Sequence, residues 1–415
     1  MYYDNSKNVV VIGGGAAGMM AAAVAASNGK RVTLLEKNKS LGEKLKITGG
    51  TRCNITNNEH DNRTFLEYFG RAKDFLFSPF SQFAVKETFE FFESRGLPLV
   101  VQARNRVFPE SEKAWDVYKT LEKELHKNHV TVKTRVKVTK INTDQGKIVS
   151  VDTNQGRFEA ASFILATGGV SHPETGSTGD GFGWLRDLGH TVKDPTPTIV
   201  PIAVADDWIK CMPGVSLSFM KITFFLEGKK QFSKTGKVLF THFGLSGPLI
   251  LNSAAQVGEL LFNGEVTAAI DAFPNTDHGA LDDKIVNFFE KNKNKTFKTI
   301  FKDLVPHGTT KGIEMLLTDI INFETPVHSI TKEQRKIFVN LLKALPVSIT
   351  GLMGNDRAVS ADGGVILEEI DMKTMRSKLF PNLFVIGDLL HINRPSGGYS
   401  LQLCWTTGYI AGINA

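Results

Sequence analysis

"VVVIGGGAAGMMAAAVAASNG", residues 9–29, is the stretch of the sequence that decides the fold. Its β-branched start predicts a buried parallel strand, and an alanine-rich helix follows that Gly29 can close. Between them, Gly13, Gly15 and Gly18 stand in G-x-G-x-x-G spacing. These glycines let the backbone turn sharply and approach a pyrophosphate at the helix N-terminus. The stretch therefore predicts a dinucleotide site, with contacts from Gly13, Gly15, Ala16 and Gly18.

A second β-branched strand, "RVTLLE" at 31–36, ends in an acid. Glu36 lies about 20 residues beyond the glycines, where a carboxylate can accept both ribose hydroxyls of a nucleotide. An acid at this position also disfavours a 2′-phosphate. The strand, helix, second strand and terminal acid together predict a dinucleotide-binding unit. They do not distinguish NAD from FAD as its ligand.

Two segments then favour FAD. A long polar loop, "KNKSLGEKLKITGGTRCNITN" at 37–57, stands where a simple dehydrogenase would continue with its third strand. Residues 137–169 predict three short strands with glycines in the turns, followed by an apolar strand that ends at Thr167 and Gly168. A β-meander that returns to the parallel sheet is typical of FAD domains.

The C-terminal region supplies a third segment. "NLFVIGDLL", 382–390, predicts a strand that ends at Gly387 and Asp388, and Asp388 is placed to hydrogen-bond the ribityl chain. A last helix begins after a glycine pair that ends at Gly398. Its free N–H groups, around Tyr399, Ser400 and Leu401, would face the pyrimidine edge of the flavin. That edge becomes negative on reduction, so a helix N-terminus there stabilises reduced flavin.

The composition changes in the middle of the chain. Prolines at 195, 197 and 201 indicate a crossing out of the FAD domain. Hairpin strands and then lysine-rich amphipathic helices follow. We expect an α/β fold whose FAD-binding domain is formed by residues 1–190 and 345–415. It is interrupted by an inserted β domain, 191–344, which carries a small helical subdomain at about 276–330.

Six motifs together resemble one family. "VIGGGAAGMMAA", "KITGGTRCNITN", "RVFPES", "LATGGVSHPETGSTGDG", "LFTHFGLSGP" and the terminal "GDLL…SGGYSLQ…GYIAG" occur in this order over nearly the whole chain. They are similar to motifs of the BaiN-like flavoproteins, within the glutathione-reductase-like FAD superfamily. The resemblance implies a discontinuous Rossmann-like FAD domain with a parallel sheet and β-meander, an inserted barrel-like β domain and a small helical domain. It also implies noncovalent FAD and an FAD- or NAD(P)H-dependent oxidoreductase; one branch of the family reduces unsaturated bile-acid intermediates.

The resemblance further implies which residues contact FAD. Carried onto this sequence, the contacts fall on Ala17, Glu36, Lys37, Lys44, Gly49, Gly50, Arg52, Cys53, Asn54, Val136, Gly168, Asp388, Ser400 and Leu401.

Cys53 has no redox partner nearby in the sequence. Disulfide-using flavoenzymes carry a second cysteine five residues later, where this chain has Asn58. We therefore expect hydride to leave the flavin N5 directly, without a dithiol relay. No second G-x-G-x-x-G follows a strand, which predicts no separate NAD(P)H domain. NADH or NADPH would then bind transiently, at the same flavin face as the substrate.

The composition of the chain narrows the classes of protein that remain. Three cysteines without short spacing indicate neither a disulfide framework nor a metal site and fit a cytoplasmic protein. No signal peptide is expected, and no apolar stretch approaches the ~20 residues that span a bilayer. The net charge of +6 comes from dispersed lysines, so attraction of anionic cofactors explains it as well as nucleic acid does. A flavin-dependent RNA-modifying protein and a redox-sensing flavoprotein without turnover remain alternatives.

Four residues are the candidates for the catalytic face. If the insertion covers the flavin, the cleft is bounded by "THFG" (241–244), "SADGGV" (360–365) and "HINRPSGGY" (391–399). His242, His391, Arg394 and Tyr399 would then be within reach of a small-molecule substrate. Arg394 would be a fixed positive donor, and a histidine or Tyr399 would supply the proton opposite hydride delivery.

Overall fold

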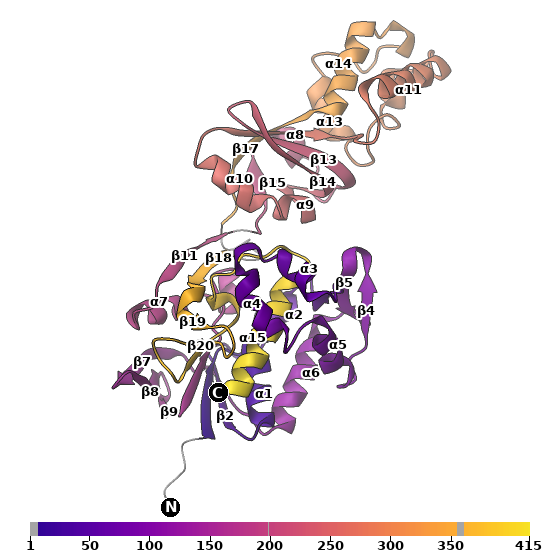
Figure 1. Ribbon diagram of the computed structural model, residues 1–415. Coiled ribbons are helices and arrows are strands. Elements are labelled where there is room, and N and C mark those ends of the chain that lie inside the picture. Colours follow the sequence, from indigo (N-terminus) through magenta and orange to yellow (C-terminus); the bar gives the residue numbers. More distant parts are fainter. Residues whose placement is uncertain (1–6, 198, 355–360) are drawn as a thin grey trace, which may run out of the picture. The chain divides into compact units, whose positions relative to one another are not determined.

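The computed structural model describes residues 7–197, 199–354 and 361–415. The chain forms two compact units (Figure 1). Unit 1 combines both ends of the chain, Met1–Pro197 and Val359–Ala415, and unit 2 is the segment between them, Thr198–Ala358. Within the described residues, no helix is both long and apolar enough to cross a membrane.

Unit 1 is organised around a seven-stranded sheet in the order β19-β20-β21-β10-β1-β2-β6. Its five strands from β21 to β6 run parallel, whereas β19 and β20 pair antiparallel at one edge. Apolar residues fill β1, β10 and β21 because helices cover a parallel sheet on its faces. The bounds are β1 Asn8–Ile12, β2 Arg31–Glu36, β6 Thr131–Thr134, β10 Ser162–Leu165, β19 Ile370–Asp371, β20 Arg376–Ser377 and β21 Leu383–Val385. The predicted parallel sheet is confirmed.

Two helices from opposite ends of the sequence pack side by side in unit 1: α1 (Ala16–Ser27) and α15 (Tyr399–Asn414) (Figure 1). Both are buried on nearly every side, which explains why neither shows a polar face. Small residues make the approach possible. A Cβ on Gly408 of α15 would lie 2.6 Å from the carbonyl oxygen of Ala17, and one on Gly412 would lie 2.8 Å from the Val24 Cβ.

Three smaller sheets accompany the parallel sheet: β11 and β18 form an antiparallel pair, and the other two sheets have three strands each. The predicted meander is β7 (Val138–Asp144), β8 (Lys147–Thr153) and β9 (Gly156–Glu159), and it leads into β10. A second three-stranded sheet, in the order β3-β5-β4, consists of β3 (Thr56–Asn57), β4 (Leu99–Gln102) and β5 (Arg106–Pro109). The other elements of unit 1 are α2 Glu43–Ile47, α3 Asn62–Glu67, η2 Gly70–Ala72, α4 Lys73–Phe80, α5 Val85–Glu93, η3 Ala103–Asn105, α6 Ala114–Lys127, η4 Pro173–Thr175, α7 Asp180–Asp187, β11 Val192–Pro197, β18 Ala361–Val365, η6 Leu367–Glu369 and η7 Gly387–Leu389.

Unit 2 is a closed barrel with helices added to it. The barrel order is β12-β15-β14-β13-β16-β17, and β13 with β14 forms its longest hairpin. One apolar core runs through both the barrel and the helices, including Phe224 and Phe240 of the barrel and Phe297 and Phe338 of the helices. The bounds are β12 Ile202–Val204, α8 Asp207–Lys210, β13 Ser216–Leu226, β14 Lys229–Thr241, β15 Gly244–Ser246, α9 Pro248–Leu251, α10 Ala254–Leu261, β16 Val266–Asp271, α11 His278–Lys291, α12 Phe297–Phe301, α13 Thr310–Leu317, η5 Val327–Ser329, α14 Lys332–Lys343 and β17 Leu345–Leu352. The expected inserted barrel is confirmed.

The α1–α15 contact predicts a position-specific effect on stability. Gly408→Ala places a Cβ against a backbone oxygen, so we expect overpacking to lower the free energy of unfolding by about 1–3 kcal/mol. Gly183→Ala in α7 is the matched control: its Cβ meets nothing within 4 Å and should change stability by no more than about 1 kcal/mol, in the stabilising direction. Urea unfolding followed by circular dichroism measures both. Equal stability of the two variants would contradict the close packing.

Candidate functional site

The glycine turn between β1 and α1 is fixed by backbone hydrogen bonds. Gly13 N–H donates to the carbonyl of Leu35 at 2.8 Å, and Gly14 N–H donates to Oε2 of Glu36 at 2.8 Å. Oε1 of Glu36 accepts from the N–H of Asn38 at 2.7 Å. The buried carboxylate thus joins the end of β2 to the turn, and its remaining lone pairs are available to hydroxyl donors.

Two glycines of the turn, Gly13 and Gly18, cannot carry side chains. A Cβ on Gly18 would lie 1.9 Å from the carbonyl oxygen of Gly13, and a Cβ on Gly13, whose φ is 105°, would lie 2.4 Å from that of Ala166. Gly15, the N-cap of α1, instead meets nothing within 4 Å. This open space lies at the helix N-terminus beside Ala16 and Ala17, where N–H groups and the helix dipole favour a phosphate.

The predicted flavin loop is backbone-strained. Gly49, Gly50, Thr51 and Cys53 all have left-handed φ, between 60° and 69°. Cys53 is fully buried as a free thiol, and this burial raises its pKa above the ordinary range, so it carries no thiolate. Conformations of this kind cost free energy and are concentrated at functional sites.

Two side chains of the same loop point in different directions. The Arg52 guanidinium donates to Oε1 of Gln102 at 2.6 Å and pairs with Glu112 on the β4–β5 side. Oδ1 of Asn54 is buried and has no hydrogen-bond partner among the described residues. A buried acceptor without a donor is expensive unless a ligand supplies one.

Lysines of the loop contact the segment that follows β10. Lys37 Nζ lies 2.6 Å from Oδ2 of Asp180, the first residue of α7. Lys44 Nζ donates to Oγ of Ser171 and lies 3.6 Å from Oδ2 of Asp388. Lys44 therefore joins α2 to the segments that follow β10 and β21 of the parallel sheet.

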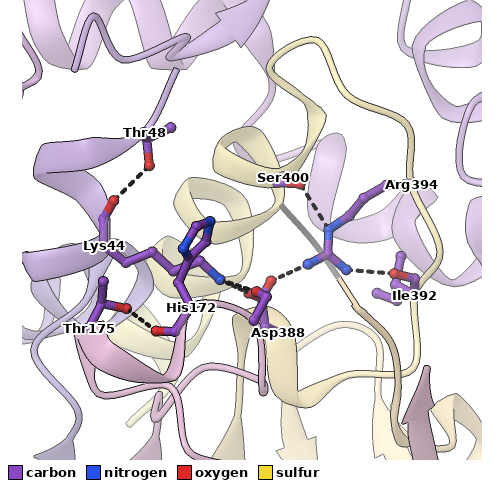
Figure 2. A network of polar contacts seen from close by, with 9 residues as sticks. Lys44, Thr48, His172, Thr175, Asp388, Ile392, Arg394 and Ser400 are labelled. Atoms are coloured by element: carbon purple, nitrogen blue, oxygen red, sulfur yellow. Dashed lines mark hydrogen bonds and ion pairs between the residues drawn. The ribbon is translucent and has the colours of Figure 1, made fainter. Parts of the chain in front are cut away.

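Asp388 is the centre of a polar network that Figure 2 shows from close by. It pairs with the Arg394 guanidinium, which also donates to the carbonyl of Ile392 at 2.6 Å and to Oγ of Ser400 at 3.2 Å. Burial alone would raise the pKa of Asp388, but the charges of Arg394 and Lys44 outweigh it and hold the pKa below its ordinary value. Asp388 is therefore ionised at neutral pH.

Four further predicted positions follow strands of the parallel sheet. Val136 N–H donates to the carbonyl of Glu36 at 2.9 Å, so the backbone before the meander lies beside the nucleotide turn. Oγ1 of Thr167 is buried with no described hydrogen-bond partner, and Gly168 has a left-handed φ of 73°. Gly387 N–H donates to Oγ1 of Thr407, which attaches the Asp388 turn to α15.

Helix α15 begins at Gly398, whose φ of 103° only glycine tolerates. Tyr399 in its first turn is buried, and its ring centroid lies 4.9 Å from that of Phe65 and 4.8 Å from that of Tyr68. Burial, followed by the neighbouring Tyr68, raises the pKa of Tyr399, so the phenol keeps its proton. Leu401 is buried in the same turn.

The four candidate catalytic residues have different environments. Arg394 and Tyr399 are buried in unit 1 as described, and His391 is partly exposed there, with Nε2 3.3 Å from Oδ1 of Asp362. His242 is exposed at the β14–β15 turn of unit 2, where its ring packs edge-on against Phe243. Ser360, the first residue of "SADGGV", lies outside the described residues.

Two residues in the region of the candidate site were not singled out by the sequence analysis. Ser171 accepts a hydrogen bond from Lys44 in the segment that follows parallel strand β10, where ligand contacts are common, so its place in the sequence indicated a role in the site. Gln402 is fully buried in α15; its Oε1 accepts from the hydroxyls of Thr56 at 2.6 Å and Thr88 at 3.0 Å. No local pattern predicts the role of Gln402, because the two hydroxyls that donate to its amide oxygen are far away in the sequence.

These residues fit FAD. The open space at Gly15 lies at a helix N-terminus, Glu36 keeps acceptor capacity for ribose hydroxyls, and the unpartnered Asn54 and Thr167 oxygens would be satisfied by a polar ligand. The ionised Asp388 can accept from ribityl hydroxyls, and the start of α15 can stabilise negative charge.

The sequence and the fold are similar to known proteins. The family described as HI0933-like protein Rossmann domain matches residues 7–414. The 3-dehydro-bile acid delta(4,6)-reductase of Clostridium scindens is 30% identical over 384 residues, 92% of each chain. The ribosomal RNA dihydrouridine synthase of Haemophilus influenzae is 27% identical over 93% of this chain and 92% of that protein. A 3-ketosteroid delta1-dehydrogenase from Sterolibacterium denitrificans shares the fold at 13% identity, with a TM-score of 0.52 over 98% of this chain and 99% of that one.

The position of Glu36 predicts its effect on cofactor affinity. Glu36→Ala removes a buried charged acceptor and releases the N–H groups of Gly14 and Asn38. We expect FAD to bind about 10- to 150-fold more weakly, equivalent to about 1.5–3 kcal/mol. Quenching of flavin fluorescence on titration of the apoprotein gives the dissociation constant. The exposed Glu93→Ala should bind FAD like the wild type; an unchanged constant for Glu36→Ala would argue against this ribose contact.

The Asp388–Arg394 pair predicts a pH-dependent contribution to stability. Because the folded pKa of Asp388 lies below the ordinary aspartate value of about 3.9, the ion pair contributes fully above about pH 4. The contribution is lost as the pH falls through the lower folded value. Asp388→Asn leaves Arg394 buried without its partner, which should cost about 3–5 kcal/mol at pH 7. The difference from the wild type should be constant from pH 5 to pH 7 and shrink below about pH 4.

Urea unfolding at a series of pH values, with FAD in excess, measures this difference. Asp144→Asn on the exposed end of the meander serves as the control and should follow the wild type at every pH. A loss for Asp388→Asn that does not diminish in acid would show that the ion pair is not its source.

Proposed function

Because the chain belongs to the HI0933-like family and is an FAD-dependent oxidoreductase, we propose that it reduces a carbon–carbon double bond conjugated to a carbonyl in a small organic substrate. The proposed electron donor is NADH or NADPH, which binds transiently. Bound FAD supplies hydride transfer. The observation that carries the proposal is the buried Asp388–Arg394–Lys44 network beside the start of α15, in a unit whose loop cysteine is an inert thiol.

The contribution of the network is electrostatic. Two cations, Arg394 and Lys44, surround the single carboxylate of Asp388, so the site keeps a net positive charge next to a helix N-terminus. Such an arrangement favours negative charge in a ligand. Arg394 is a positioning residue in this proposal, because its described donors go to Asp388, Ser400 and the backbone. We therefore favour this positioning role over direct contact between Arg394 and the substrate.

Cys53 supports direct transfer rather than a dithiol relay. Its thiol is fully buried, its pKa is raised, and Asn58 stands where the relay partner would be. The thiolate that a disulfide exchange requires is therefore strongly disfavoured.

Reduction of a polarised double bond also needs a proton. Tyr399 keeps its phenolic proton across the physiological range and lies next to Tyr68, which is more than half exposed. We favour Tyr399 as the proton source, with His391 second because it is more exposed and close to Asp362. His242 lies in unit 2 and stays a prediction from the sequence.

The relatives support this reaction class from two directions. One is named a 3-dehydro-bile acid delta(4,6)-reductase, and a double bond at position 4 is conjugated to an oxo group at position 3. Two are named ribosomal RNA dihydrouridine synthases, at 27% and 24% identity. Dihydrouridine differs from uridine by reduction of the C5=C6 bond, which is conjugated to the C4 carbonyl. Both names therefore describe hydride and proton addition to the same kind of bond.

RNA modification is the second candidate function for this reason, and the net charge of +6 is compatible with it. A redox-sensing flavoprotein without turnover is the remaining alternative, and it would bind FAD without reducing either kind of acceptor.

Anaerobic flavin reduction distinguishes these functions. We expect NADH or NADPH to bleach the bound flavin and a cyclic enone such as a 3-oxo-4-ene steroid to restore its colour, with one saturated product for each NAD(P)H consumed. Stopped-flow absorbance and mass spectrometry of the product measure both steps. Unmodified ribosomal RNA is the parallel acceptor, with dihydrouridine as its product.

Cys53→Ala is tested in the same assay and should keep the rate of flavin reduction within a small factor of wild type. A loss of several orders of magnitude with FAD still bound would contradict direct transfer. Reoxidation by RNA alone would move the function to the second candidate, and no reoxidation by either acceptor would support redox sensing.

A further inference from the structure

Three strands of unit 1 bring polar side chains together on one face of the β3-β5-β4 sheet. Asn57 of β3 pairs with Arg106 of β5, and Arg106 pairs with Gln102 of β4. Directly opposed residues of neighbouring strands point to the same face of a sheet. The three side chains therefore form a row across the sheet, with Arg106 in the middle.

Arg52 lies on this face as well. It donates to Gln102 at 2.6 Å, and its guanidinium carbon is 4.3 Å from the ring centroid of Phe108. Phe108 stands two residues after Arg106 and so points to the same side of the sheet. Arg52 and Arg106 thus belong to a single surface, which we call the arginine face: Arg52, Asn57, Gln102, Arg104, Arg106 and Phe108.

The arginine face carries uncompensated positive charge. Arg106 is partly buried, and burial together with the charges of Arg104 and Arg52 lowers its pKa. The side chains of Arg104 and Arg106 make no hydrogen bond or ion pair with any residue that the structure describes. Among these arginines Glu112 pairs with Arg52, and it also accepts from the Gln102 amide, while Nε of Arg52 is buried without a described partner. A partly buried guanidinium without a described acceptor, as at Arg106, is costly unless an anion supplies one.

This face is joined to the cofactor site by direct contacts. Nδ2 of Asn57 donates to the carbonyls of Arg104 and Gly397, each at 3.4 Å. A Cβ on Gly398 would lie 2.3 Å from the carbonyl carbon of Thr56, so β3 is pressed against the turn that begins α15. Arg104 and Asn105 have left-handed φ values of 65° and 55°, and strain of this kind is typical of functional loops.

We propose that the arginine face binds an oxyanion, a carboxylate or a phosphate, of the molecule that exchanges hydride with the cofactor, with Arg106 as its main donor. The proposal rests on the proposed function for the identity of that molecule. The phosphates of FAD have a separate place at the β1–α1 turn, beside the open space at Gly15. A planar guanidinium can hold a carboxylate or phosphate with two parallel hydrogen bonds, and Arg104 is exposed and available as a second donor.

Binding of inorganic phosphate and of acetate to the FAD-loaded protein tests the site without turnover. At constant ionic strength, each anion should raise the thermal unfolding temperature of the wild type in a saturable manner. Arg106→Gln should weaken this binding about tenfold or more, and Arg106→Lys should restore part of it. Arg157→Gln is the matched control, because Arg157 is exposed and paired with Asp152 on the meander.

Two kinetic comparisons identify the source of the anion. A selective loss of NADPH affinity over NADH affinity in Arg106→Gln would identify the 2′-phosphate of the donor. A selective loss for an acceptor carboxylic acid over its methyl ester would identify the substrate. Either result supports the proposal. Equal anion binding by wild type and Arg106→Gln, or no saturable binding by the wild type, would overturn it.

Two safeguards keep the test decisive. If Arg106→Gln loses FAD or fails to fold, the exposed Arg104→Gln should show a smaller loss of anion binding in the same direction, and wild-type binding by Arg104→Gln would then overturn the proposal. The anion titration needs no turnover. The protein could therefore bind anions saturably and in an Arg106-dependent manner without reducing enones. That result would support the anion site and contradict the proposed function.

Discussion

The contact between α1 and α15 is the constraint on which the rest of unit 1 depends. Gly408 lets α15 approach the carbonyl of Ala17, and Gly18 lets α1 approach the turn at Gly13. These close approaches bring the first and last parts of the chain together, so that a glycine turn at residue 13 and an aspartate at residue 388 can share one site. Any side chain at these glycines would separate the two halves, and the strand ends of the sheet would no longer converge on the same ligand.

Local signals predicted the order of strand, glycine turn, helix and second strand at the N-terminal end of the parallel sheet. The β-branched strand, the glycine spacing and Glu36 all lie within residues 9–36, and each acts through its immediate neighbours. The meander and the parallel sheet were also predictable, since turn glycines and apolar runs reflect local chain geometry. Closure of the barrel was expected only through the family resemblance. Its closing pairs join β12 to β15 and to β17, and no alternation within one strand encodes which distant strand it will meet.

Side-chain partners were the least predictable feature. Arg394 was expected to face a substrate, and in the structure its guanidinium donates to Asp388, Ser400 and the backbone. Gln402 has partners far away in the sequence, because its amide oxygen accepts from threonines more than 300 positions away. A buried polar group must find partners wherever the fold provides them, and the sequence near it carries little information about where that is.

The charges of unit 1 fall into two groups with different degrees of compensation. Around Asp388, Lys44 and Arg394 share one carboxylate, and every described donor of Arg394 has a partner, so this group can fix the geometry of a cofactor before it binds. On the arginine face, Glu112 pairs with Arg52, and the side chains of Arg106 and Arg104 have no described partner. A fully paired network is rigid. Unpaired charges destabilise the protein, and a bound anion offsets that cost. This contrast is the physical reason to assign the resident cofactor to the first group and the transient ligand to the second.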